Sequence, residues 1–245
     1  MTKNIFKTLG ILIITFLILS ASYIVNLFLM KPLSMDHYLA KELVVELIDS
    51  PEAMTYVGIF DRFSWLTKHS SKLSIPTEND RNEDISELED RLKRLQSYDI
   101  NKLSDIQKTT REIAIFDTKN NLKNKKEFYY HDFPLNQIGG IHLSTIEFLN
   151  SMHPIRNLSE ANALVDRAFQ IKAVFEGTRK SLERQAEIGI YPPGFVYDHV
   201  VEQLTSFIEY TDEEHPLFTQ VDRKIQEINL TNEDRSMLKE KLKNA

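Results

Sequence analysis

LGILIITFLILSASYIVNLFLM, residues 9–30, decides the architecture, because this stretch contains no charged residue. As a helix, its 22 residues would extend roughly 33 Å, enough to cross the hydrocarbon core of a bilayer. A buried core helix is the alternative, but an uncharged run of this length at a terminus is typical of a membrane segment. We therefore expect residues 1–30 to form a signal-anchor or transmembrane segment, with residues 9–30 in the membrane.

The same segment could instead be a signal peptide that is removed. Residues 20–22, Ser-Ala-Ser, offer small side chains at the spacing of a cleavage site. The apolar run continues for eight residues beyond them, through residues 23–30, which favours an uncleaved segment.

Orientation is less well specified by the flanking charges. Lys3 and Lys7 precede the segment, and Lys31 and Lys41 follow it, so the positive-inside rule hardly discriminates. The basic N-terminus is similar to that of a secretory signal. We therefore expect a single-pass membrane protein whose domain lies on the periplasmic or extracellular side.

The rest of the chain has the composition of a helical globular protein. Only seven glycines and eight prolines occur in 245 residues, which favours helices joined by few turns over a many-stranded sandwich. A net charge of −6 gives no electrostatic reason to expect nucleic acid as a partner. The absence of cysteine excludes disulfides, thiolate zinc sites and a cysteine nucleophile. We expect an all-α protein, with about seven to nine helices after the N-terminal one.

Helical spacing and capping residues locate these helices. The main helices are predicted over residues 35–49 (after Ser34), from Ser50-Pro51, 85–95, 104–120, 144–152 (a capping box at Ser144 and Glu147), 159–189, 195–208 and from Thr231. Residues 70–83 are polar and suggest an exposed loop. The apolar residues expected to face inward or pack beneath a helix include Leu43, Val44, Ile48, Phe60, Phe63, Trp65, Ile106, Ile113 and Phe116.

No pattern in the chain indicates catalysis. A zinc-peptidase helix needs two histidines four residues apart with a glutamate between them, and no pair of the seven histidines has this spacing. His131, His142 and His153 recur every eleven residues, but a shared metal site is the weaker interpretation beside ordinary hydrogen-bonded histidines. Gly139-Gly140 alone does not make a phosphate loop, and we expect this pair to give the backbone freedom to turn.

Several ordered motifs nevertheless resemble a known family. Residues 133–140, Phe-Pro-Leu-Asn-Gln-Ile-Gly-Gly, are similar to the P-x-N-Q-x-x-G segment of the bacterial proteins of domain of unknown function 885 (DUF885). Three later segments match in the same order: residues 153–155, residues 187–190, and residues 192–204. The resemblance extends over roughly residues 31–230. It implies structural or cleft-lining roles for Pro134, Asn136, Gln137, Gly140, Pro193, Phe195 and Gln203.

The resemblance also implies what this chain does not contain. Longer members resemble helical zinc metallopeptidases whose His-Glu-x-x-His helix lies in a C-terminal half, so zinc is expected only there. No catalytic or metal-binding residue is carried over. Residues 231–245 form an amphipathic helix that we expect to begin the missing half, with an apolar face lacking a partner; the alternative is that this helix folds back on the domain.

Three functions remain open at this point. The first is a membrane-anchored helical protein that is non-catalytic on its own. The second is one half of a split metallopeptidase completed by a separate chain that carries the C-terminal half. The third is a membrane-tethered adaptor that holds another protein through charged helical faces such as residues 78–95.

Overall fold

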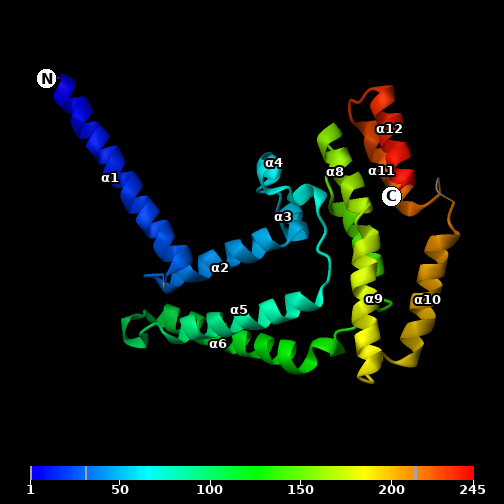
Figure 1. The fold of residues 1–245 in the computed structure, drawn as a ribbon, viewed down its shortest axis with the longest axis horizontal. Coiled ribbons are helices and arrows are strands. Elements are labelled where there is room, and N and C mark those ends of the chain that lie inside the picture. Colours follow the sequence, from blue (N-terminus) through cyan, green and yellow to red (C-terminus); the bar gives the residue numbers. More distant parts are fainter. Residues whose placement is uncertain (1, 31, 212–213) are drawn as a thin grey trace. The chain divides into compact units, whose positions relative to one another are not determined.

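The structure is a computed structural model that describes residues 2–30, 32–211 and 214–245; Lys31 lies outside these ranges. The described residues form helices and no strands. The α-helices are α1 (Thr2–Leu29), α2 (Met35–Asp49), α3 (Pro51–Val57), α4 (Ser64–Thr67), α5 (Glu78–Gln96), α6 (Asp105–Lys123), α7 (Ile141–Glu147), α8 (Leu158–Ala168), α9 (Ile171–Glu187), α10 (Gly194–Glu209), α11 (Pro216–Glu227) and α12 (Asn232–Lys243) (Figure 1). The predicted helical class is confirmed, with short helices such as α4 and α7 adding to the number expected.

Helix α1 is long and apolar enough to cross a membrane over Lys7–Phe28, with a mean hydropathy of 2.3. Among the described residues, it is the one helix that meets this criterion. At its end the Asn26 side chain accepts a hydrogen bond of 3.1 Å from the backbone N–H of Leu33. The predicted N-terminal apolar helix, long enough to span a membrane, is therefore present.

The chain divides into two compact units. Unit 1 comprises the residues up to 46 and residues 85–123, and unit 2 comprises residues 47–84 and 124–245. Helices α2 and α5 each begin in one unit and end in the other.

Unit 1 has a small core. Its buried apolar residues are Met35, Tyr38, Leu95 and Tyr98. Hydrogen bonds from side chains to the backbone add to this packing: Tyr98 Oη donates to the Pro32 carbonyl at 2.9 Å, and Arg111 Nε donates to the Leu95 carbonyl at 2.8 Å. Because Arg111 lies on α6 and Leu95 on α5, the second bond ties these two helices together.

Several residues predicted to face inward in unit 1 are instead exposed. Leu43 is 68% exposed, Ile106 80%, Ile113 63% and Phe116 68%. Val44 and, beyond the unit boundary, Ile48 are also exposed. Helical spacing identified the apolar residues, but α2 buries Met35 and Tyr38 instead, one turn apart near its start.

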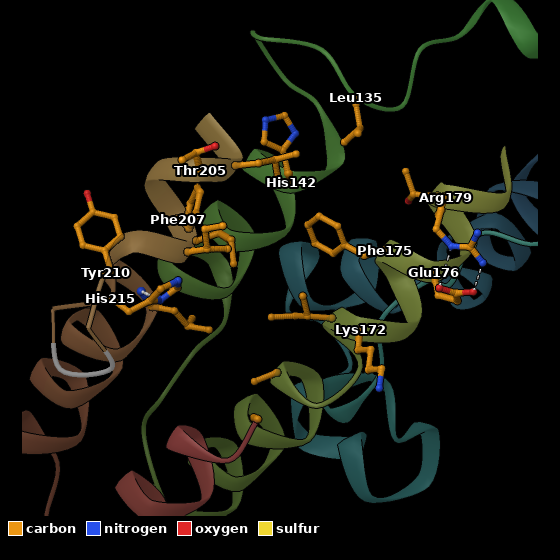
Figure 2. A pocket seen from close by; sticks show the side chains of 18 of the residues that line it. Leu135, His142, Lys172, Phe175, Glu176, Arg179, Thr205, Phe207, Tyr210 and His215 are labelled. Atoms are coloured by element: carbon orange, nitrogen blue, oxygen red, sulfur yellow. Dashed lines mark hydrogen bonds and ion pairs between the residues drawn. The ribbon is translucent and has the colours of Figure 1, made fainter. Parts of the chain in front are cut away.

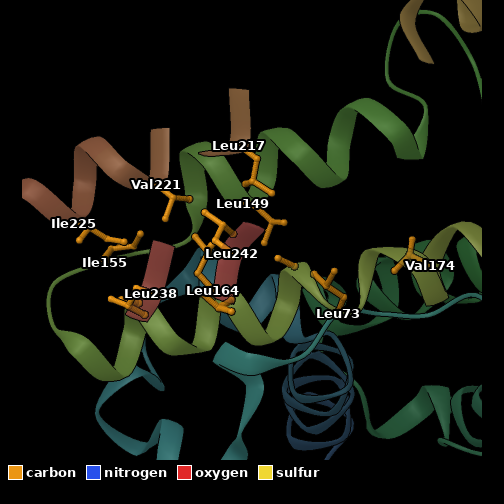
Figure 3. Close-up of a cluster of buried hydrophobic side chains, with 13 residues drawn as sticks. Leu73, Leu149, Ile155, Leu164, Val174, Leu217, Val221, Ile225, Leu238 and Leu242 are labelled. Carbon is orange, nitrogen blue, oxygen red and sulfur yellow. The ribbon is translucent and has the colours of Figure 1, made fainter. Parts of the chain in front are cut away.

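Unit 2 has an extended core to which several helices contribute (Figure 3). Helix α8 buries Ala161, Leu164, Val165 and Ala168 along one face. Helix α12 packs against α8, and α11 packs against α12 and residues 148–152. The cluster continues to Leu73, in the segment before α5. The buried members are Leu73, Leu149, Ile155, Ala161, Leu164, Val165, Ala168, Val174, Leu217, Val221, Ile225, Leu238 and Leu242.

The last helix corrects one expectation. Thr231 caps α12 as predicted, since its side chain accepts a hydrogen bond of 3.1 Å from the Asp234 N–H. However, the apolar face of α12 is covered: Leu238 is fully buried and Leu242 is 9% exposed, within the core of unit 2. The helix folds back on the domain, which was the alternative considered above.

The predicted helix over residues 159–189 is two helices. The chain turns at residues 169–170, so that α8 ends at Ala168 and α9 begins at Ile171. The cap is Asn157 rather than Ser159, and its side chain accepts a hydrogen bond of 3.0 Å from the Glu160 N–H. The C-terminal end is as predicted, with Gly189 at φ +74°, a conformation that suits glycine.

Three other local predictions differ from the structure. Ser144 does not cap a helix, because α7 already begins at Ile141 after Gly140. Part of the predicted loop is helical, since α5 begins at Glu78. Phe63 and Trp65 do not pack beneath a helix; they are 53% and 73% exposed, whereas Phe60 is half-buried.

Candidate functional site

The turn over residues 133–141 is built by the side chain of Asn136. Its Oδ1 accepts hydrogen bonds from the backbone N–H groups of Ile138 (3.1 Å) and Gly139 (2.9 Å). Its Nδ2 donates to the Phe133 carbonyl at 3.2 Å. The Pro134 carbonyl accepts from the Ile141 N–H at 2.8 Å, which leads the chain into α7. This is the local role for which asparagine is favoured in turns.

Residue 140 must be glycine because a larger side chain would clash with its neighbours, not because the backbone needs a conformation that only glycine adopts. A Cβ at this position would lie 2.6 Å from the backbone nitrogen of Asn136 and 2.8 Å from Cε1 of His142. Neither Gly139 nor Gly140 has a positive φ, so the freedom we expected from the glycine pair is not used. The glycine lets the turn pack directly against the imidazole.

Gln203 of α10 joins the turn to α7. Its Nε2 donates to the Gln137 carbonyl at 3.1 Å, and its Oε1 lies 2.9 Å from Nε2 of His142. The first bond fixes the orientation of the amide, so Nε2 of His142 is the donor in the second. His142 is only 1% exposed, and its Nδ1 has no hydrogen-bond partner among the described residues.

The seven residues singled out from the sequence are thus only partly brought together. Gln203 contacts His142 and the Gln137 carbonyl, Gly140 lies against His142, and Asn136 and Pro134 shape the turn that carries Gln137 and Gly140. Pro193 and Phe195 belong to the start of α10, where the Pro193 carbonyl accepts from the Val196 N–H at 2.9 Å and Phe195 is 59% exposed. His142 itself was missed, although it follows Gly140 by only two residues.

An open apolar groove lies beside this cluster, within unit 2. Its volume is about 980 Å³. The walls come from α7, α9, α10 and α11, and Leu135, Ile146, Phe175, Leu182, Leu204 and Phe207 are among the residues that line it. Figure 2 shows Phe175 on one side of the opening and Phe207 on the other, with His142 at the edge. None of the seven singled-out residues lines it, but their neighbours Leu135, His142 and Leu204 do.

Several polar side chains that line the groove interact with neighbouring groups of the protein. Arg179 pairs with Glu176 at 2.6 Å and with Glu183 (Figure 2). His215 accepts a hydrogen bond of 3.2 Å from the Leu217 N–H at the start of α11. Lys243 lies 5.5 Å above the ring of Phe218. With His142 bonded to Gln203, the groove offers apolar walls with structurally engaged polar groups along its margin.

A second cluster of polar groups in unit 2 centres on Arg167, which is fully buried. Its guanidinium donates to the carbonyls of Lys72 (2.8 Å) and His69 (2.9 Å) and to Oγ1 of Thr55 (2.7 Å). It also donates to Nδ1 of His153 at 2.7 Å. Burial lowers the pKa of Arg167 to about 10, which still leaves it charged at neutral pH. One arginine thereby joins α3, the segment after α4, and α8.

His153 is neutral in this cluster. Its Nε2 donates to the Glu160 carbonyl at 3.0 Å, and its Nδ1 accepts from Arg167. Burial lowers the pKa of His153 to about 4, because a second positive charge beside the guanidinium would be desolvated and repelled. One local signal points to this cluster: Arg167 falls on the apolar face of α8, between Leu164 and Ala168.

The three regularly spaced histidines have separate roles. His142 contacts Gln203, His153 contacts Arg167, and His131 is exposed beside the ring of Phe128. Among the described residues, no three histidine, aspartate or glutamate side chains gather in a geometry that could hold a metal ion.

Fold and groove together define an all-helical protein with a potential N-terminal membrane span and an apolar groove in its larger unit. The family model "Bacterial protein of unknown function (DUF885)" matches residues 51–245, and the chain belongs to this family. The resemblance stated from the sequence is therefore confirmed. No curated protein matches the chain.

Among solved structures, a bacterial lipoprotein is similar in fold. It is "the putative lipoprotein from Colwellia psychrerythraea", with a TM-score of 0.66 and 15% sequence identity. The similarity covers 83% of this chain but only 37% of that one, so this chain spans little more than a third of its length. At this identity the likeness shows the fold alone.

Proposed function

We propose that this DUF885 protein is a membrane-anchored, extracytoplasmic binding protein, non-catalytic on its own, that holds an apolar segment of another polypeptide in the groove of unit 2. The observation that carries the proposal is the character of the groove: its volume is about 980 Å³, its walls are mainly apolar, and Glu176, Arg179 and His142 on its lining are engaged in structural contacts. A concave apolar site with few oriented polar groups is the usual form of a binding site.

The occupant we propose is an amphipathic helix with acidic residues on its polar side. An aliphatic stripe would contact walls such as Phe175 and Leu204. Lys172 and Lys243 line the same groove and are exposed, so they would favour glutamates at its margin. Helix-in-groove binding of this kind needs no chemistry from the groove itself.

The split metallopeptidase remains a second proposal, in which the bound polypeptide is a separate chain that completes a zinc enzyme. The zinc that the longer members are expected to hold would then come with a second chain carrying His-Glu-x-x-His. The earlier reason for this proposal, an uncovered face on α12, no longer applies, because Leu238 and Leu242 are buried. What supports it now is the groove, which a second polypeptide could cover.

The membrane part of the proposal is tested on the full chain in cells. We expect the protein to stay in the membrane fraction after carbonate extraction with an intact N-terminus, because α1 is long and apolar enough over Lys7–Phe28 to serve as an anchor. An alkaline phosphatase fusion after Ala245 should be active. Release by carbonate would contradict the anchor, and an inactive fusion would reverse the orientation.

The binding part is tested with a fluorescent amphipathic helical peptide carrying leucines at helical spacing and glutamates between them. Val201→Glu places a negative charge at an exposed position of the groove and should weaken binding by about tenfold or more. The matched control, Ile106→Glu, makes the same change at an exposed residue of α6 and should bind as the native chain does. Equal affinity for all three proteins, or no binding, would contradict the proposal.

The non-catalytic part has its own readout. The full chain in nanodiscs should retain no stoichiometric zinc by elemental analysis and should leave a peptide library intact. Metal-dependent cleavage by the isolated chain would overturn this statement. Cleavage that appears only with a second chain bearing His-Glu-x-x-His would instead establish the split enzyme.

A further inference from the structure

The end of α3 and the segment through α4 expose an unusually apolar surface. We call residues 56–66 the apolar tip; all of it belongs to unit 2. Five large side chains of the tip face solvent: Tyr56 (72% exposed), Ile59 (67%), Phe63 (53%), Trp65 (73%) and Leu66 (67%). Scattered apolar residues are normal on a protein surface, but five within eleven consecutive residues form a concentrated feature.

The backbone of the tip is held in a defined shape. Gly58, at φ +69°, ends α3, and its N–H donates to the Met54 carbonyl at 3.0 Å. Lys68, at φ +54°, ends α4 in the same left-handed conformation, and its N–H donates a hydrogen bond of 2.7 Å to the Ser64 carbonyl. Each end of the tip is therefore a sharp helix termination.

Buried polar groups fix the tip from beneath. Arg167 donates hydrogen bonds to the Thr55 hydroxyl and the His69 carbonyl, and these two residues flank the tip on either side. Within the tip, Asp61 accepts a hydrogen bond of 2.5 Å from Arg156, and its Oδ1 lies 3.7 Å from Nε2 of His69. The apolar side chains are thus presented on a braced support, which argues for a binding role rather than for incomplete packing.

The charges beside the tip are basic. Arg62 and Lys68 are exposed, whereas Asp61, the only acidic residue among residues 56–68, is occupied by Arg156. Trp, Tyr, Phe and Leu together with basic side chains make up the composition that inserts at the boundary between lipid headgroups and acyl chains. Anionic headgroups would complement Arg62 and Lys68.

We propose that the apolar tip inserts into the interfacial zone of the membrane that holds α1, with Arg62 and Lys68 on anionic lipid headgroups. The inference rests on the membrane anchor of the proposed function. Only residues 30–55 separate the tip from α1, so tethering raises the local concentration of lipid around it. Insertion would give unit 2 a second attachment to the bilayer besides the span.

The chain carries its own probe for this contact, because Trp65 is its only tryptophan. The full chain is placed in nanodiscs of phosphatidylcholine with phosphatidylglycerol, and lipids brominated at shallow or deep positions are introduced. We expect shallow brominated lipids to reduce Trp65 emission by about twofold, and aqueous iodide to quench it weakly, because an interfacial indole lies near the headgroups. Nanodiscs without phosphatidylglycerol should give less quenching by lipid.

The double variant Phe63→Ser/Leu66→Ser keeps Trp65 and removes two exposed side chains of the tip, so folding should be unaffected. It should lose most of the quenching by lipid and gain quenching by iodide. The matched control is Ile138→Ser/Ile188→Ser, which alters two exposed residues of unit 2 outside the tip (87% and 41% exposed) and should behave as the native chain does.

The outcomes separate this inference from the proposed function. If the chain elutes with the nanodiscs but Trp65 is quenched by iodide and not by brominated lipid, the anchor stands and the inference is overturned. If the chain does not remain with the nanodiscs, the anchor itself fails. Trp65 that is unquenched by pure lipid but shielded from iodide in native membranes would assign the tip to a protein partner and would likewise overturn the inference.

Discussion

The two units of the chain use apolar residues in different ways. Unit 2 gathers thirteen buried apolar residues from several helices into one core, and α8 contributes a whole face. Unit 1 buries only four, and it exposes Leu43, Ile106 and Phe116 on its helices. The comparison shows that an apolar stripe identifies the residues a helix could bury, whereas tertiary packing determines which of them are buried.

The sharpest way to break unit 2 is to remove its buried arginine. Arg167→Met would leave the Lys72 carbonyl and Nδ1 of His153 without their donor, and the His69 carbonyl would keep only the backbone N–H of Lys72. We expect the free energy of unfolding to fall by about 4 kcal/mol, since each buried group loses a charge-assisted bond. Chemical denaturation followed by circular dichroism measures this loss, with Lys180→Met at an exposed position of α9 as the control. A change equal to the control's would contradict the assigned role.

Acid should weaken the same unit through His153. Its pKa is about 4 in the folded chain and 6.5 as a free side chain, so the unfolded chain takes up the proton first as the pH falls. Stability is therefore complete above pH 6.5 and decreases between pH 6.5 and 4, by about 3 kcal/mol in total. The pKa of His69 is also lowered by burial, which acts in the same direction. His153→Gln should flatten the profile measured by denaturant midpoints; an unchanged profile would exclude His153 as its source.

Matched leucines test the comparison of the two cores directly. Leu238→Ala, at a fully buried position of unit 2, should cost about 3 kcal/mol, because it removes buried methyl groups and leaves a cavity. Leu43→Ala, at a residue of unit 1 that is 68% exposed, should cost no more than about 0.5 kcal/mol. Thermal unfolding of both variants in the same detergent compares the two losses of stability. Similar losses would mean that Leu43 is covered in the working protein.

The last prediction concerns a single hydrogen bond of unit 1. Tyr98→Phe removes the hydrogen bond of 2.9 Å from the phenol to the Pro32 carbonyl and should lower stability by about 1 kcal/mol. Hydrogen exchange should report faster exchange in α5 and unchanged exchange in α8. Faster exchange in α8 as well would show that the two units unfold together.

Much of the fold could be predicted because the decisive signals are local. Met35–Asp49, the caps at Ser50 and Thr231, and the uncharged segment before residue 31 all depend on neighbours within one or two helical turns. The break between α8 and α9 and the exposure of Phe63 and Trp65 depend on distant contacts. No local pattern near residues 169–170 signals the turn that Gln170 supports by bonding to Leu73 and Ser71.

The candidate site divides in the same way. Asn136 and Gly140 could be singled out because a turn motif and a family resemblance coincide there. In the structure Asn136 shapes the turn, and Gly140 lies against His142. The partnership of His142 with Gln203 spans 61 positions, and that of Arg167 with Thr55 spans 112. Only packing brings such residues together, so the groove and the buried arginine could not be placed from the sequence.

Hydrogen exchange of the full chain in nanodiscs, with and without a saturating amount of the acidic amphipathic peptide, tests the central claim that unit 2 binds a polypeptide. The proposal predicts slower exchange in α9 (Ile171–Glu187) and α10 (Gly194–Glu209), which wall the groove, and unchanged exchange in α6 (Asp105–Lys123). Slowing confined to α6, or no slowing at a peptide concentration that saturates binding, would contradict it.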